Sequence, residues 1–130
     1  MLMEPLLEER RIEWSWSRRD DLGDVAVDKN QLEQVLLNVL KNAAEAIGED
    51  GRIDLFAGPE NGRRVLEIRD TGRGLDEEAQ RGIFRPFYTT KENGRGLGLT
   101  LVNEILTNHG FAFSLENREE GGAVFRLVLR

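Results

Sequence analysis

The chain has 130 residues, of which 39% are hydrophobic and 32% charged, so its composition fits one globular domain spanning residues 1–130. The formal net charge of −6 argues against a nucleic-acid binder, because affinity for phosphate backbones comes mainly from basic surface. The absence of cysteine excludes disulfides, thiolate metal sites and cysteine nucleophiles. No window approaches the roughly 18 apolar residues of a membrane span, so we expect a soluble domain without membrane contact, in a cytoplasmic location.

The first predicted element is a strand over residues 12–17, where apolar and polar residues alternate. This alternation places Ile12, Trp14 and Trp16 on one face. Two indoles on one strand face are typical of packing beneath a helix, so we expect both in the core. An exposed indole would instead indicate a docking surface for a helical domain or a receiver domain.

A long helix is predicted next, with Asp28 as the N-cap and Gly48 as the stop. Its apolar residues follow helical spacing: Leu32, Val35, Leu36, Val39, Leu40, Ala43 and Ile47. Residues 51–58 and 62–70 then predict an antiparallel pair of strands. The turn signal between them covers residues 58–62.

The remaining elements alternate between helix, loop and hairpin. Asp76 caps a predicted short helix over 77–84, residues 86–96 predict a mobile loop, and a helix runs from Leu97 to a stop at Gly110. Residues 111–117 and 121–130 predict a closing hairpin. The whole predicts an α+β fold, a two-layer α/β sandwich in which three helices back a mixed sheet of about five strands.

Polar residues form a narrow stripe along the long helix, beside its apolar face. The stripe consists of Gln31, Gln34, Asn38, Asn42 and Glu45. Asparagine inside a helix lowers helix stability by up to about 0.7 kcal/mol relative to alanine. Asn38 and Asn42, which lie one turn apart, therefore need an explanation. Amide oxygens suit a hard cation such as Mg²⁺. The alternative is a polar flank that only meets solvent.

A second constellation, Asp70-Thr71-Gly72-Arg73-Gly74, lies where a predicted strand ends. The carboxylate can accept a hydrogen bond from the exocyclic amine of adenine, and glycine lets the backbone approach a flat ring. One alternative is an ordinary strand-end turn. Another is an acid protease, but Arg73 would lower the carboxyl pKa that protease chemistry needs raised.

The third constellation is a set of glycines, at positions 94, 96 and 98, that leads into a helix. Such glycines present backbone N–H groups to a phosphate chain, and Lys91 and Arg95 can add positive charge. The pattern is neither a Walker loop nor a dinucleotide fingerprint, and a flexible linker is the alternative. A cation site, an adenine acceptor and a phosphate cradle together predict Mg-ATP as the ligand.

These residues resemble the catalytic ATP-binding domain of sensor histidine kinases, within the superfamily of gyrase, the Hsp90 chaperone and MutL, which has the Bergerat-type fold. "QLEQVLLNVLKNAAEAI" resembles its N box, "DTGRGL" its G1 box, "IFRPFYTTK" its F box and "GRGLGLTLVNEI" its G2 box. The resemblance covers nearly the whole chain. The short "PFYTTK...GRGLGL" lid is similar to that of the nitrogen-regulation branch.

The resemblance implies a role for each matching residue. Asn42 would coordinate Mg²⁺ with support from Asn38, and Asp70 would receive the adenine amine. Gly72 and Gly74 would shape the base pocket. The remaining ATP-binding residues would contact the phosphates or surround the metal: Glu45, Lys91, Arg95, Gly96, Leu97, Gly98 and Leu99.

The resemblance also implies phosphoryl transfer rather than hydrolysis. The superfamily's ATPases carry a water-activating glutamate four residues before the metal asparagine, where this chain has Asn38, and an amide is no general base. The sole histidine, His109, lies at a predicted helix end and is expected to be structural. The acceptor histidine would therefore lie on a helical dimerisation domain outside this chain, with a response regulator receiver domain as the next partner. Alternatives are a serine/threonine kinase of the anti-sigma-factor type and a non-catalytic nucleotide-gated module.

Overall fold

The computed structural model describes residues 4–18, 28–75, 77 and 98–129. Five strands form one sheet in the order β1-β2-β3-β5-β4. Only the pairing of β1 with β2 is parallel, so the sheet is mixed, as predicted. The elements are α1 (Glu4–Glu9), β1 (Ile12–Arg18), α2 (Lys29–Ile47), β2 (Gly51–Glu60), β3 (Arg63–Asp70), α4 (Gly98–His109), β4 (Ala112–Asn117) and β5 (Ala123–Leu129).

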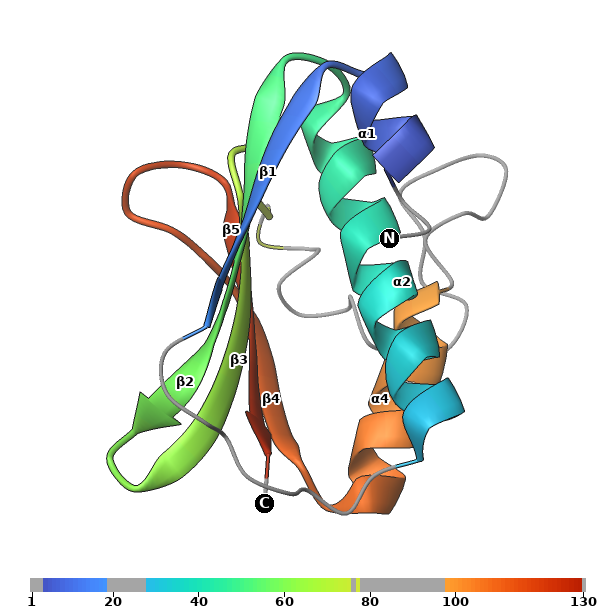
Figure 1. The fold of residues 1–130 in the computed structure, drawn as a ribbon, viewed down its shortest axis with the longest axis vertical. Coiled ribbons are helices and arrows are strands. Elements are labelled where there is room, and N and C mark those ends of the chain that lie inside the picture. Colours follow the sequence, from blue (N-terminus) through green and yellow to red (C-terminus); the bar gives the residue numbers. More distant parts are fainter. Residues whose placement is uncertain (1–3, 19–27, 76, 78–97, 130) are drawn as a thin grey trace.

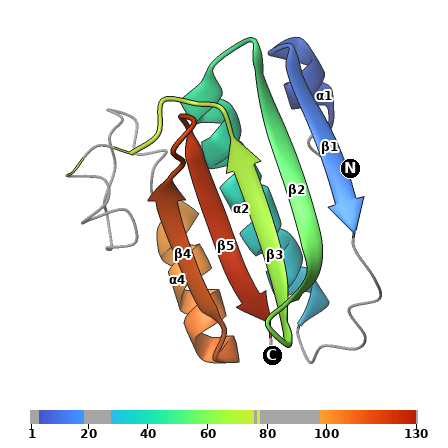
Figure 2. The same cartoon turned by 90° about the vertical axis from the view of Figure 1, so that its left-hand side faces the viewer.

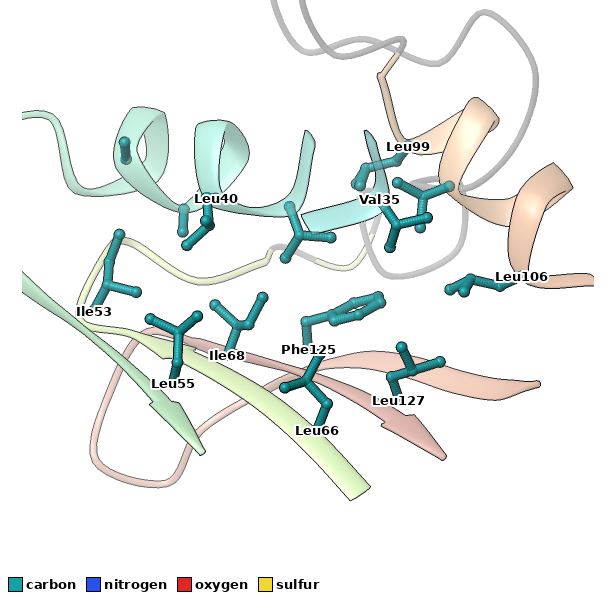
Figure 3. Close-up of a cluster of buried hydrophobic side chains, with 14 of the residues drawn as sticks. Val35, Leu40, Ile53, Leu55, Leu66, Ile68, Leu99, Leu106, Phe125 and Leu127 are labelled. Atoms are coloured by element: carbon teal, nitrogen blue, oxygen red, sulfur yellow. The ribbon is translucent and has the colours of Figure 1, made fainter. Parts of the chain in front are cut away.

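The helices cover one face of the sheet, and in the described part of the chain no helix covers the other face (Figures 1 and 2). This arrangement confirms the predicted two-layer α+β fold. The core lies between the layers, where side chains from α2 and α4 meet those of the sheet (Figure 3). Its labelled members are Val35, Leu40, Ile53, Leu55, Leu66, Ile68, Leu99, Leu106, Phe125 and Leu127. None of the described helices is long and apolar enough to cross a membrane.

Helix α2 begins and ends where its sequence predicts. The Asp28 side chain accepts a hydrogen bond from the Gln31 N–H, and Gly48 forms the C-cap with a φ of 76°. The seven side chains of the predicted apolar face are buried or half-buried against the core. The helix is thus fixed at both ends and along one face, which positions its polar stripe.

The β2–β3 turn is tighter than predicted. Strand β2 continues through Pro59 to Glu60, and only Asn61 and Gly62 connect it to β3. Both have positive φ, 53° and 78°, as in the two-residue turn that matches the twist of a hairpin. The predicted five-residue turn was wrong because the Asn-Gly pair alone suffices to reverse the chain.

Helix α1 is an element that the sequence patterns did not predict. Its Leu7 is fully buried in the core. In the turn after it, Arg11 pairs with Asp50 at 2.8 Å and with Glu49 at 2.9 Å. These exposed ion pairs join the α1–β1 turn to the α2–β2 turn. A helix of six residues offers too few turns for its periodicity to be recognised.

The prediction that both tryptophans are core residues was wrong. Ile12 is buried, but Trp14 is 39% exposed and Trp16 51% exposed. Their strand neighbours across β1–β2 are the buried Ile53 and Leu55, so the indoles do project from the helix-covered face. Strand β1 is an edge strand that packs against the short α1, whereas α2 packs on β2 and β3. The predicted helix over 77–84 and the loop over 86–96 lie outside the described residues, apart from Glu77.

Candidate nucleotide site

The amide pair of the polar stripe lies on α2, half-buried at the edge of the core. The Asn42 Nδ2 group donates a hydrogen bond to the backbone carbonyl of Asn38 at 2.9 Å. This bond fixes the orientation of the amide through its nitrogen. Among the described residues no donor is bonded to the amide oxygen, so the Asn42 Oδ1 atom fits the ligand expected for Mg²⁺.

Asp70 ends β3 with only 6% of its surface exposed. Its Oδ1 accepts hydrogen bonds from the backbone N–H of Gly72 at 2.8 Å and of Ala123 at 3.3 Å. Burial raises the pKa of this carboxyl, and those two hydrogen bonds together with the charge of Arg118 partly offset the increase. With Oδ1 held by the backbone, Oδ2 remains as an acceptor for a ligand donor such as the adenine amine.

The segment that follows Asp70 packs directly on α2. The Arg73 N–H donates to the Ala46 carbonyl at 3.2 Å. A Cβ at Gly72 would lie 2.7 Å from the Ala46 carbonyl carbon, which is too close for any side chain. Ala46 is one helical turn beyond Asn42. The structure therefore brings the Asp70 segment to the same stretch of α2 that carries the amide pair.

Gly74 is required for a different reason. Its φ is 76°, and a Cβ there would lie 2.7 Å from the Asn117 side-chain oxygen. Contacts within the protein thus account for glycine at both Gly72 and Gly74. Their role in shaping a base pocket remains a prediction.

The other predicted site residues divide into described and undescribed ones. Glu45 lies half-buried on α2. Gly98 begins α4, and the side chain of Leu99 is buried in the core, so only the backbone of Leu99 is placed to meet a phosphate. Four predicted contacts lie outside the described residues, as does the lid on which the resemblance to the nitrogen-regulation branch depends: Lys91, Arg95, Gly96 and Leu97.

The described residues offer few ligands for a metal ion, so a cation here would have to complete its coordination with other groups. Within residues 4–18, 28–75 and 98–129, no three His, Cys, Asp or Glu side chains gather into a metal site. Mg²⁺ typically uses one or two protein oxygens and completes its shell with water and substrate phosphates. A single amide oxygen fits that pattern, whereas a Zn²⁺ site typically has three or four protein ligands.

Sequence patterns missed the β4–β5 hairpin as part of this site. Ala123 and Arg118 reach Asp70, although they lie 53 and 48 residues away along the chain. A Cβ at Gly122 would lie 1.9 Å from the Asp70 carbonyl oxygen, so the hairpin turn meets the end of β3. In the sequence, Gly121 and Gly122 indicate a turn. Nothing in the pattern indicates which strand end the turn touches.

His109 has the structural position that its sequence predicts, in the last turn of α4. Its Nδ1 donates to the Ile105 carbonyl at 2.9 Å, and its Nε2 accepts from the Asp28 N–H at 3.1 Å. These two bonds define the neutral tautomer with the proton on Nδ1. Both ring nitrogens are occupied in joining the end of α4 to the start of α2.

Comparison with known proteins identifies a matching protein family and several similar proteins. Residues 27–130 match the family described as histidine kinase-, DNA gyrase B- and HSP90-like ATPase. The sensor histidine kinase ZraS of Escherichia coli K12 is 35% identical over 120 residues, which is 92% of this chain and 26% of that protein. Sporulation kinase C of Bacillus subtilis is 37% identical over 102 residues, 78% of this chain and 24% of that protein. The chain therefore spans about a quarter of the length of these relatives.

Solved structures show the same fold. The catalytic domain of histidine kinase ThkA superposes with a TM-score of 0.87 at 32% identity, over 98% of this chain and 84% of that domain. Full-length ShkA in complex with AMPPNP gives a TM-score of 0.85 at 32% identity, over 98% of this chain and 27% of that one. ThkA in complex with the response regulator protein TrrA gives a TM-score of 0.75 at 31% identity, over 98% of this chain and 36% of that one.

Proposed function

The chain belongs to the histidine kinase-, DNA gyrase B- and HSP90-like ATPase family, and we propose that it binds Mg-ATP between α2 and the end of β3. Its fold and relatives are those of the catalytic ATP-binding domain of sensor histidine kinases. The observation that carries the proposal is the contact between the Asp70 segment and α2, made by the Arg73 N–H and the Ala46 carbonyl. This contact joins the segment that begins at Asp70 to the helix that carries Asn42, which supports a shared site.

Each group of the site then has one task. Asp70 Oδ2 accepts the hydrogen bond of the adenine amine, and Asn42 Oδ1 binds Mg²⁺, which neutralises charge on the phosphates. Asn38 holds the Asn42 amide through its backbone carbonyl. Glu45 and the backbone at the start of α4 face the phosphate side. Lys91, Arg95, Gly96 and Leu97 add the phosphate contacts that the family resemblance implies.

We propose that the γ-phosphate goes to an external histidine. Asn38 stands where a water-activating glutamate would be needed, and an amide cannot take a proton from water. Catalysis then depends on positioning and on the metal, as is usual for phosphoryl transfer. His109 does not serve as the acceptor, because both of its ring nitrogens are engaged by backbone groups. Intrinsic ATP hydrolysis should accordingly be slow.

The proposed acceptor is a helical dimerisation domain of the same kinase, which would pass the phosphate to a response regulator. Support comes from two of the similar structures, one of a full-length kinase with AMPPNP and one of a kinase with its response regulator protein. We also place the domain in the cytoplasm, where ATP and such a regulator are available.

Phosphoryl transfer in trans tests this function. The chain is mixed with the helical phosphoacceptor domain of the full-length protein and with ATP labelled on the γ-phosphate. We expect acid-labile label on that domain, none on His109 by mass spectrometry, and no label when Asn42→Ala replaces the parent. Acid-stable label would point to a hydroxyl acceptor instead, and rapid ATP hydrolysis without transfer would refute the kinase assignment.

A further inference from the structure

The β4–β5 hairpin holds the segment 70–75 from the side opposite to α2 (Figure 1). We propose that Asn117 and Arg118 are positioning residues, which keep this segment in the shape that presents Asp70 to the base. The inference rests on the proposed function for the identity of the ligand. The hairpin lies outside the four sequence boxes that identify the family.

Asn117, the last residue of β4, makes two hydrogen bonds to the backbone of Leu75. Its Oδ1 accepts from the Leu75 N–H at 2.6 Å, and its Nδ2 donates to the Leu75 carbonyl at 2.8 Å. One side chain therefore satisfies both backbone groups of a residue 42 positions away, as a neighbouring strand would. The approach is close enough that a Cβ at Gly74 would collide with the Asn117 oxygen. Asparagine is suited to this contact, since it offers one donor and one acceptor on adjacent atoms.

Arg118 fixes the other end of the segment. Its Nη1 donates to the backbone carbonyl of Asp70 at 2.9 Å, and its Nη2 pairs with Glu120 at 3.2 Å. The backbone N–H of Arg118 also donates to the Gly122 carbonyl, and this bond closes the hairpin turn. Burial raises the pKa of the Asp70 carboxyl, and the positive charge of Arg118 offsets part of that increase.

The two anchors determine where the Asp70 carboxylate lies. Its Oδ1 accepts one hydrogen bond from Gly72, within the clamped segment, and one from Ala123, at the start of β5. Both donors reach the same oxygen only while the segment and the hairpin keep their spacing. Loss of the Asn117 contacts would release the segment on its C-terminal side. The carboxylate would then lose the alignment that lets its second oxygen face a ligand.

Variants of the hairpin separate positioning from general stability. Asn117→Ala removes both contacts with Leu75, Asn117→Asp removes only the donor, and Arg118→Lys keeps the charge without the planar guanidinium. Glu119→Ala is the matched control, because Glu119 is an exposed residue of the same turn with no bond to segment 70–75. Amide hydrogen exchange in the nucleotide-free chain reports on the segment itself. We expect faster exchange at Leu75 and Gly72 in Asn117→Ala and parent rates in Glu119→Ala.

Nucleotide affinity provides the second measurement. Inosine triphosphate carries an oxygen in place of the adenine amine and keeps the same triphosphate. We expect Asn117→Ala to lower ATP affinity about three- to tenfold, the usual effect of losing one or two hydrogen bonds, and to lower inosine triphosphate affinity less. The preference for ATP over inosine triphosphate should therefore fall, while Glu119→Ala retains it. Should Asn117→Ala fail to fold, Asn117→Asp and Arg118→Lys carry the same comparison.

The outcomes distinguish this inference from the proposed function. Unchanged exchange at Leu75 together with an unchanged nucleotide preference in the hairpin variants would overturn the positioning role. Equal loss of affinity for both nucleotides would overturn it as well, because that is the effect of general destabilisation. A parent chain that binds both nucleotides equally would instead refute the base site at Asp70. The exchange rates would then still show whether the hairpin holds the segment.

Discussion

Asp70, the proposed base acceptor, is a buried carboxylate that costs the fold stability. Burial disfavours the charged carboxylate, and the two backbone donors with Arg118 only partly offset this effect, so the pKa is raised. A carboxyl whose pKa is higher in the folded than in the unfolded state stabilises the fold at low pH. It loses that contribution as the pH rises through the folded pKa. At neutral pH the ionised Asp70 therefore lowers the stability of the fold, in the state that the proposed acceptor role requires.

Replacing Asp70 by asparagine should separate stability from binding. The amide oxygen of Asp70→Asn can accept the same bonds from Gly72 and Ala123, while its NH₂ group faces the ligand with the wrong polarity. Denaturant unfolding should show the variant at least as stable as the parent at pH 7. The difference should shrink as the pH falls toward about 3.9, the ordinary aspartate pKa. ATP affinity should fall tenfold or more, consistent with about 1.5–3 kcal/mol for a hydrogen bond to a charged group. Retained affinity would exclude Asp70 as the base acceptor.

Asn42 should contribute to ATP affinity only when Mg²⁺ is present. In Asn42→Ala the oriented oxygen is lost, so calorimetry should show roughly tenfold weaker ATP binding with Mg²⁺ and little change with EDTA. Gln34→Ala is the control, since Gln34 is an exposed residue of the same helix. Equal weakening with and without Mg²⁺ would assign Asn42 to the nucleotide rather than to the metal.

Among the elements, α2 carries the amide pair, and its start depends on a single cap. Asp28 bonds the Gln31 N–H at 3.0 Å, and its own N–H donates to His109. Asp28→Ala should lower the free energy of unfolding by about 1 kcal/mol, the usual loss of an N-cap. Asp28→Asn, which caps equally well, should lower the free energy of unfolding much less. Chemical denaturation with both variants checks this, and equal losses would show that the negative charge rather than the hydrogen bond matters.

Strand β1 exposes its two tryptophans at the edge of the sheet. Collisional quenching of the indole fluorescence should therefore be efficient in the isolated chain. If this edge is the docking surface that exposed indoles indicate, adding the helical domain should protect them and shift their emission to shorter wavelength. Efficient quenching that the helical domain leaves unchanged would confirm the exposure and exclude this edge as its docking surface.

The elements differ in how far their sequence predicts them. Helix α2 was predictable to its caps, because Asp28, Gly48 and seven apolar positions agree on one helix. Helix α1 was missed, since six residues carry no clear period. The tryptophans were misplaced because alternation tells which face of the sheet a side chain takes, and not whether a helix extends over that strand. Asp70 and Asn42 are predicted as site residues from their type and spacing, whereas the contacts of Asn117 and Arg118 with segment 70–75 are long-range and leave no local pattern.

At the scale of the whole molecule, the two layers bring distant segments to one site. The polar stripe of α2 and the end of β3 meet because α2 packs over the sheet, and the β4–β5 hairpin closes the same end of β3 (Figure 2). The described fold thus brings the proposed metal ligand, the proposed base acceptor and the proposed support for that acceptor from three separate stretches of chain. This convergence is the basis of the nucleotide assignment.

A crystal structure of the chain with Mg²⁺ and a non-hydrolysable ATP analogue tests that assignment most directly. We predict that the adenine amine lies within hydrogen-bond distance of Asp70 Oδ2, and that Asn42 Oδ1 and the phosphates bind Mg²⁺. A nucleotide found at another place, or none at saturating concentration, would contradict it.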